Sequence, residues 1–228
     1  MDARLDYVFE FLSDLARQNT RAWMHTRINE RRFDVVQRTM QRWVAMLLLD
    51  MQDIEDTHGI RPKDCLYRIW RDTRFSADKT PCKTYLSFLI RKGGRRNEDR
   101  AAYYVQIGPG GQSFAGGGVY MPEPGRLKRI RERIATDGPE LARIVGAPGF
   151  RRTFGDLESL KLKTMPREYR TADLSPAVRD LVRHTSWVAG RQFPDDEVLG
   201  RDFDRELMRT FAVLKPFNDW LNGALAAG

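Results

Sequence analysis

The spacing of apolar residues changes twice along the chain, and this change restricts the fold more than any other feature. Over residues 5–54, apolar side chains recur every three or four positions, which predicts amphipathic helices. Over residues 85–120 they alternate with other residues between glycine-containing turns, which predicts an antiparallel meander. Helical spacing returns after residue 122. The order of helices, meander and helices predicts an α+β fold, in which a curved antiparallel sheet packs with helices from the N- and C-terminal parts.

Local patterns give the expected boundaries of these elements. In the N-terminal part we expect helices over about 5–16, around Trp23 and over 30–54, the last one ended by His58 and Gly59. A strand over Leu66–Trp70 is expected to extend the meander. After the meander we expect helices over 127–134 and 141–145, a strand over 184–193, and closing helices over 202–214 and 216–226.

No linker divides the chain. Its 228 residues are within the size range of one large domain, and no Pro/Gly/Ser-rich or low-complexity stretch interrupts them, so we expect a single domain over residues 1–228. The longest apolar run, Trp43–Leu49, is far shorter than the roughly 20 residues that span a bilayer. The first six residues lack the apolar stretch of a signal peptide. We therefore expect a cytoplasmic protein that does not contact a membrane.

Positive charge is concentrated in the middle of the chain. The formal net charge is +8, and residues 61–170 carry 24 basic and 12 acidic side chains, whereas both flanking parts are slightly acidic. Such a field favours anionic partners, whether phosphorylated small molecules or nucleic acid. Arginine outnumbers lysine 31 to 8, however, and a GC-rich genome can produce this bias without any ligand.

The densest group of charges lies at residues 68–83, where a strand is expected to lead into an ordered loop. The planar guanidinium of arginine suits carboxylates and phosphates, so one interpretation is an anion-binding site. The other is an internal ion-pair lattice, in which two aspartates hold the arginines and fix the loop. Both interpretations stay open. The candidate ligand-binding residues are Arg68, Arg71, Asp72, Arg74, Asp78, Lys79 and Lys83.

A family resemblance rests on the same segment. Its signature-like residues are Arg68, Arg71, Asp72, Arg74, Phe75, Asp78 and Lys79. They resemble the signature of a bacterial family, the domain of unknown function 2461, and residues 19–23, 116–122 and 127–131 are similar to that family as well. Cys82 stands where the signature ends in a tyrosine. The resemblance implies a single bacterial domain of about this length, and it brings no established activity, cofactor or catalytic residue.

The histidines and cysteines do not indicate a metal or a cofactor. His25, His58 and His184 are far apart in the sequence, and none has the spacing of a zinc site. Cys65 and Cys82 form neither a disulfide framework nor a zinc knuckle, so we expect reduced, packed thiols. We expect no metal and no cofactor. His184 is followed by two hydroxyl side chains and could act as a base, although a structural histidine is the more frequent role.

Two further features could serve an anionic partner. Gly116–Gly118 would let backbone N–H groups approach a phosphate, but no phosphate-loop motif surrounds these glycines, and a bent strand or bulge is favoured. The turn at 91–100 is rich in arginine and would hold nucleic-acid phosphates without reading sequence. Nearby aromatic residues could form a stacking platform for bases or could be core: Tyr85, Tyr103, Tyr104 and Phe114.

We therefore expect a domain that binds a phosphate- or carboxylate-bearing small molecule through the basic loop at 68–83, with enzymatic activity left open. The first alternative is a nucleic-acid-associated protein that uses the basic middle of the chain. It is placed second because neither a recognition helix nor an RNP-like motif is evident. The other alternative is an interaction scaffold that has no ligand.

Overall fold

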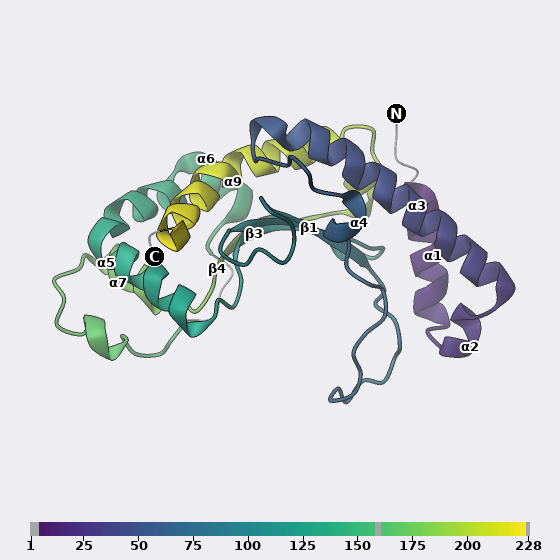
Figure 1. The fold of residues 1–228 in the computed structure, drawn as a ribbon, viewed down its shortest axis with the longest axis horizontal. Coiled ribbons are helices and arrows are strands. Elements are labelled where there is room, and N and C mark those ends of the chain that lie inside the picture. The colour runs from purple at the N-terminus through teal and green to yellow at the C-terminus, as the bar shows by residue number, and fades with distance from the viewer. Residues whose placement is uncertain (1–4, 158–160, 227–228) are drawn as a thin grey trace. The chain divides into compact units, whose positions relative to one another are not determined.

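Four strands form one antiparallel sheet in a computed structural model that describes residues 5–157 and 161–226. Their order is β1-β2-β3-β4, as in a meander. Figure 1 shows the sheet together with the helices. The strands are β1 (Leu86–Ile90), β2 (Ala102–Ile107), β3 (Ser113–Val119) and β4 (Trp187–Phe193). Helices from the N- and C-terminal parts accompany the sheet, so the predicted α+β class is confirmed.

The helices fall into three groups along the chain. Before the sheet come α1 (Leu5–Arg17), α2 (Arg21–Met24), α3 (Arg27–Asp50), the 3-10 turn η1 (Met51–Asp53) and α4 (Pro62–Cys65). Between β3 and β4 come α5 (Pro124–Gly146), α6 (Pro148–Phe154), the 3-10 turn η2 (Arg167–Tyr169) and α7 (Pro176–Arg183). After β4 come α8 (Asp195–Val198) and α9 (Phe203–Ala226).

The chain forms two compact units, and each unit is made of three separate segments. Unit 1 comprises the described residues of 1–95, 104–115 and 192–208, and unit 2 comprises those of 96–103, 116–191 and 209–228. Four of the five boundaries between these segments fall within β2, β3, β4 and α9, so each of these elements contributes residues to both units. The expectation of a single domain over 1–228 stays a prediction.

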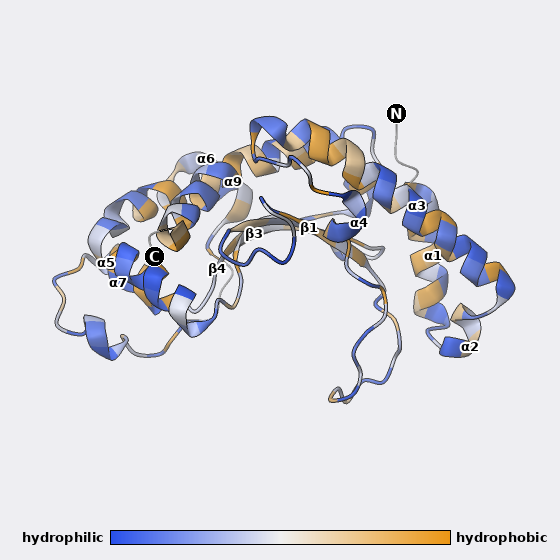
Figure 2. Ribbon diagram, in the orientation of Figure 1, coloured by the Kyte–Doolittle hydropathy of each residue, from blue (hydrophilic) through white to orange (hydrophobic). Residues whose placement is uncertain are grey.

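In unit 1, the apolar stripes of α1 and α3 pack together, and α3 also packs on β1. Figure 2 shows these stripes on helices whose other faces are hydrophilic. The ring of Phe11 in α1 lies 5.7 Å from that of Phe33 in α3. Further along α3, the buried Trp43 packs edge-on against Phe88 of β1 at 5.3 Å. Its indole N–H donates to the carboxylate of Asp204 at 2.7 Å, which satisfies the one polar atom of this ring.

In unit 2, α5 packs against α7. Burial of Ile134 and Leu141 on α5 and of Val178 and Leu181 on α7 supplies the apolar contact. Polar groups support the same contact, because the guanidinium of Arg131 donates to the main-chain carbonyls of Val182 and His184 at 3.0 and 3.1 Å.

The two predicted helices 127–134 and 141–145 are the two halves of α5, which is interrupted by the non-helical backbone of Asp137 (φ −127°, ψ 21°). Pro139 follows this interruption and lies in the first turn of the second half, where proline is tolerated. The predicted helices 202–214 and 216–226, by contrast, are one helix, α9, which continues through Pro216. Proline inside a helix costs roughly 3 kcal/mol, and the residues on both sides of Pro216 include the buried Leu214 and Phe217.

Other boundaries also differ from the expectation. The helix expected over 30–54 is α3, which begins at Arg27 because the side chain of Thr26 caps it by accepting from the N–H of Asn29. Residues 66–70 form two isolated bridges instead of a continuous strand. The strand expected from His184 begins at Trp187, and His184 pairs in a bridge with Lys161. Helices α6 and α7 and the short α4 and α8 were not predicted.

The triple glycine Gly116–Gly118 lies inside β3, as the strand interpretation predicted. Each of the three positions lies so close to neighbouring backbone that a side chain would collide with it. A Cβ at Gly117 would lie 2.1 Å from the carbonyl oxygen of Ala102 and 2.8 Å from a methyl group of Leu214. Gly118 also has a φ of +122°, which side chains rarely adopt. Glycine is required here by the packing.

We predict that Gly117→Ala lowers the free energy of unfolding by about 1–3 kcal/mol or more, because the added methyl group must displace main chain. Gly125→Ala on α5 is the matched control, since nothing lies within 4 Å of its Cβ position. Urea unfolding of both variants and the unaltered protein measures the difference. Equal stability of the two variants would contradict the close approach at Gly117.

Candidate functional site

The predicted ligand-binding residues lie in unit 1, on the segment that connects α4 to β1. Two bridges hold this segment: Leu66 pairs with Phe88 of β1, and Trp70 pairs with Cys82. Main-chain hydrogen bonds from Arg71 N–H to Pro81 O at 2.8 Å and from Lys83 N–H to Ile69 O at 2.9 Å flank the second bridge. Residues 71–81 therefore form a closed loop, here named the signature loop.

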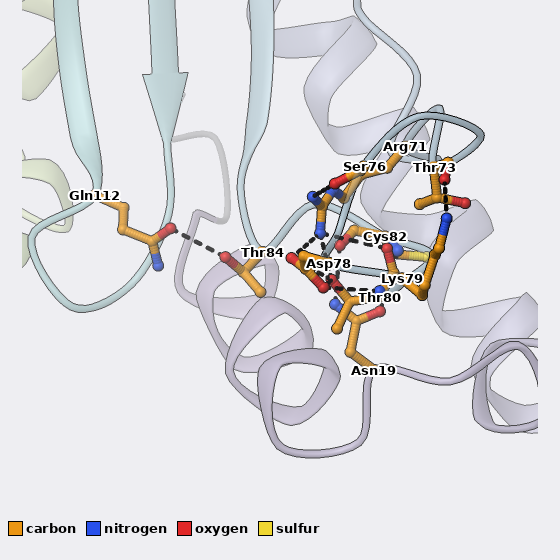
Figure 3. Close-up of polar contacts among 10 residues, drawn as sticks. All are labelled: Asn19, Arg71, Thr73, Ser76, Asp78, Lys79, Thr80, Cys82, Thr84 and Gln112. Carbon is orange, nitrogen blue, oxygen red and sulfur yellow. Dashed lines mark hydrogen bonds and ion pairs between the residues drawn. The ribbon is translucent and has the colours of Figure 1, made fainter.

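Arg71 holds the signature loop from inside (Figure 3). Its Nη1 donates to the carboxylate of Asp78 and to the hydroxyl of Thr80, and its Nη2 lies 3.5 Å from Ser76 Oγ. The carboxylate of Asp78 also accepts from the main-chain N–H of Thr80 at 2.9 Å. This N–H, the Arg71 guanidinium and the Thr80 hydroxyl together lower the pKa of Asp78 from 3.8 to about 2.

The other charges of the signature loop are also bonded within it. Arg74 donates from Nε and Nη2 to the carboxylate of Asp72 at 3.0 and 2.7 Å, and it leaves Phe75 beside it 96% exposed. Lys79 Nζ donates to the main-chain oxygen of Thr73 at 2.9 Å (Figure 3). Five of the seven predicted residues are thus engaged with one another or with the loop backbone, in the arrangement of an internal lattice.

Asn19 anchors the loop to the rest of unit 1. It lies between α1 and α2, and its side-chain amide pairs with the main chain of Cys82 through two hydrogen bonds, at 2.9 and 3.1 Å (Figure 3). The amide acts as a strand partner for a residue that is otherwise paired only on its Trp70 side. The resemblance at residues 19–23 was the only sequence indication that this asparagine matters to the site.

Both thiols are packed. Cys65 and Cys82 are free and buried, and desolvation raises the pKa of each thiol from 9.0 to about 11. Neither is therefore a reactive thiolate near neutral pH.

Arg68 and Lys83 differ from the other predicted residues, because neither has an ion pair with any residue in the described part of the chain. Lys83 Nζ lies 5.6 Å from the ring centre of Tyr67 and 5.7 Å from that of Tyr85. Burial, followed by the positive charges of Arg68 and Arg95, lowers the pKa of Lys83 from its usual 10.5. Lys83 is therefore a partly buried cation among other cations.

Arg95 completes this group and was not among the predicted residues. Its guanidinium carbon lies 4.6 Å from the ring centre of Tyr67, and its Nε donates to the main-chain oxygen of Asp64 at 3.2 Å. The sequence shows Arg95 only as part of an arginine-rich turn, and no spacing relates it to Lys83. We name Arg68, Lys83 and Arg95 the cation cluster.

Aromatic rings continue from the cation cluster across the sheet. The ring centres of Tyr67 and Tyr104 are 6.4 Å apart, and those of Tyr104 and Phe114 are 6.3 Å apart. All three residues are half-buried. We name Tyr67, Tyr85, Tyr104 and Phe114 the aromatic face. The suggestion that Tyr103 belongs to it was wrong, because Tyr103 is 1% exposed and packs at 5.0 Å against Phe211.

The rest of the arginine-rich turn is partly paired. Lys92 Nζ lies 2.9 Å from the carboxylate of Asp56 in unit 1. In unit 2, Asp99 accepts from Arg126 at 2.9 Å and from Arg129 at 3.1 Å. These ion pairs reduce the charge that the turn offers to a partner.

His184 is a buried structural residue of unit 2. It is 2% exposed, and its Nε2 lies 3.7 Å from a carboxylate oxygen of Asp180. Burial and the nearby Lys161 lower the pKa of His184 from 6.5 to about 4, against the opposite influence of Asp180. The imidazole is therefore neutral near pH 7.

Within residues 5–157 and 161–226, no group of three or more histidine, cysteine or acidic side chains is placed to hold a metal ion. No helix in these ranges has the length and apolar character needed to cross a membrane.

The sequence model of one protein family matches nearly the whole chain. The family is described as "Conserved hypothetical protein (DUF2461)", and the match covers residues 7–220. This match confirms the resemblance seen at the signature residues. Comparisons with curated proteins and with solved structures give no match.

We predict that Arg71→Gln raises the pKa of Asp78 from about 2 toward 3.8, but not completely, because the N–H of Thr80 remains as a donor. A lowered carboxyl pKa stabilises the fold above pH 3.8, and this contribution is lost as the pH falls through about 2. Carboxyl chemical shifts in an NMR titration measure the pKa. Arg74→Gln should leave the pKa of Asp78 unchanged, and an unchanged value in Arg71→Gln would contradict the role of Arg71.

For His184 we predict a loss of stability as the pH falls from about 6.5 to about 4, because the unfolded chain binds a proton that the folded imidazole does not. At 1.36 kcal/mol per pKa unit, the loss is at most roughly 3 kcal/mol. Urea unfolding at several pH values should show a weaker dependence in His184→Gln. His58→Gln removes an exposed imidazole and should retain the dependence of the unaltered protein. The same dependence in His184→Gln would count against the assignment.

Proposed function

Because the chain belongs to the DUF2461 family, whose description names no activity, we propose its function from its own geometry: it binds a small molecule that carries a phosphate or carboxylate group. The proposed anion site is the cation cluster of Arg68, Lys83 and Arg95. The observation that carries this proposal is the position of Lys83, which lies partly buried near two arginines and has no ion pair in the described part of the chain.

A cation in this position is unfavourable without an anion. Partial burial removes water from the Lys83 ammonium, the charges of Arg68 and Arg95 repel it, and both effects lower the pKa of Lys83. The ring faces of Tyr67 and Tyr85 compensate in part through cation–π attraction. A bound phosphate or carboxylate would relieve the repulsion and would accept charge-assisted hydrogen bonds from the same groups.

The signature loop supports this site in our proposal and does not itself contact the anion. Its charged side chains are already bonded within the loop, whereas the bridge between Trp70 and Cys82 brings the strand ends before and after the loop together. Arg68 precedes this bridge and Lys83 follows it. The lattice therefore holds in place two cations that are fifteen positions apart in the sequence.

We predict that inorganic pyrophosphate binds the unaltered protein and that Lys83→Met weakens this binding by about tenfold or more. The reason is the loss of a charge-assisted bond, which is worth roughly 1.5–3 kcal/mol. Calorimetric titration at low ionic strength measures the affinity. Lys63→Met is the control, since Lys63 is an exposed lysine of α4 in the same unit.

Two results would overturn the proposed function. One is the absence of pyrophosphate binding by the unaltered protein. The other is equal affinity of Lys83→Met and Lys63→Met for pyrophosphate. This result would mean that binding depends on the overall positive charge of the protein and not on the position of Lys83. Circular dichroism of both variants establishes that each is folded.

A further inference from the structure

The aromatic face begins at the cation cluster. Tyr67 contacts Arg95 and Lys83, and the rings of Tyr104 and Phe114 follow it at steps of 6.4 and 6.3 Å. The pleat of β2 separates the buried Val105 and Ile107 from the half-buried Tyr104 and Gln106, so these rings are on the side of the sheet away from the core. A row of half-buried rings next to the cation cluster suits a ligand with a planar ring and an anionic group.

The polar groups around the rings bond to one another. Tyr104 donates from its hydroxyl to Gln106 Oε1 at 3.0 Å, and Gln106 Nε2 donates to the main-chain oxygen of Gln112 at 2.8 Å. The hydroxyl of Thr84 donates to Gln112 Oε1 at 3.0 Å (Figure 3). These bonds fix the side chains from three neighbouring segments. A ligand that stacks on the rings would therefore bind a surface that is already ordered.

The β2–β3 turn beside the rings is held by its own hydrogen bonds. Gln112 Nε2 donates to Pro109 O at 2.9 Å, and the carboxylate of Asp195 accepts from the N–H groups of Gly110 and Gly111 at 2.7 and 2.9 Å. The cations that contact the rings are Lys83, at Tyr67 and Tyr85, and Arg95, at Tyr67. One group of cations beside the rings suits a ligand with one phosphate.

We propose that the ligand of this site is a mononucleotide, whose phosphate binds the cation cluster and whose base stacks on Tyr104 and Phe114. This inference rests on the proposed anion site and adds the class of the ligand. Stacking on aromatic side chains tolerates every base, because each base has a π face. The phosphate and the rings thus account for affinity, and the structure assigns no base preference.

The test compares ligands that share the phosphate but differ in the base. Calorimetric titrations use the four ribonucleoside 5′-monophosphates and ribose 5-phosphate at one ionic strength. We expect at least one nucleotide to bind about tenfold more tightly than ribose 5-phosphate. Phe114→Leu should reduce this preference about fivefold or more and leave the affinity for ribose 5-phosphate unchanged, since the variant removes the ring but not the cations.

A control variant shows whether the loss of any exposed ring has the same effect. Tyr120→Leu removes a ring that is 76% exposed in unit 2 and should have no effect. Should Phe114→Leu fail to fold, nuclear Overhauser contacts between base protons and the Tyr104 or Phe114 ring of the unaltered protein provide the second measurement, and their absence at saturation counts against the inference.

The possible failures are distinguishable. Equal affinity for nucleotides and ribose 5-phosphate would overturn the mononucleotide inference and leave the anion site in place. No binding of any phosphate compound would overturn both. A third outcome is that an oligothymidylate of twelve nucleotides binds far more tightly than the mononucleotides. If the logarithm of its affinity also falls with the logarithm of salt concentration by about 0.7 for each of several phosphates, the ligand is a single-stranded nucleic acid and the mononucleotide inference is overturned.

Discussion

The pairing of Trp70 with Cys82 is the contact on which the candidate site depends. It closes the signature loop, and it is supported on its outer side by the amide of Asn19. Arg68 lies two residues before Trp70, and Lys83 directly follows Cys82, so this pairing brings the two cations close together. The paired stretch of backbone is short, because residues 66–70 form only isolated bridges. The hydrogen bonds of the side chains within the signature loop further restrict the conformation of the loop.

The arginines of this segment have two different environments. Arg71 and Arg74 have carboxylate partners a few residues away, and such exposed pairs contribute little stability one at a time, although several in one loop restrict its conformations. Arg68 forms no ion pair in the described part of the chain, and its charge only contributes to the lowered pKa of Asp72. The lattice and the anion site, which are alternatives when the sequence is read alone, are compatible because different residues carry them.

The sequence predicted the fold class because the period of apolar residues follows directly from helix and strand geometry. It could not predict that α9 continues through Pro216, because that outcome depends on the burial of Leu214 and Phe217 against other parts of unit 2. The sequence alone left two roles open for Tyr103, a stacking platform or the core. Its alternation with Tyr104, in register with Val105, favours the core, where it lies.

For the site, the sequence indicated the segment but not the grouping within it. Asp78 forms an ion pair with Arg71, and Asp72 forms one with Arg74. No rule of sequence spacing predicts these partners. Arg95 reaches Tyr67 only because β1 and the bridged segment before it run side by side, so its position depends on the register of the sheet. The tertiary structure therefore determines which of the basic side chains form an ion pair with a carboxylate.

The way in which the chain alternates between the two units has a consequence for taking the protein apart. The segments of unit 1 end at residues 95, 115 and 208, and a segment of unit 2 follows each of them. No single cut between residues separates one unit from the other, and expression of any contiguous fragment of unit 1 removes strands or helix turns from its sheet and core. Dissection of binding in this protein therefore depends on point substitutions in the full chain, and a gene fragment that encodes the signature loop alone would lack the rings of β2 and β3.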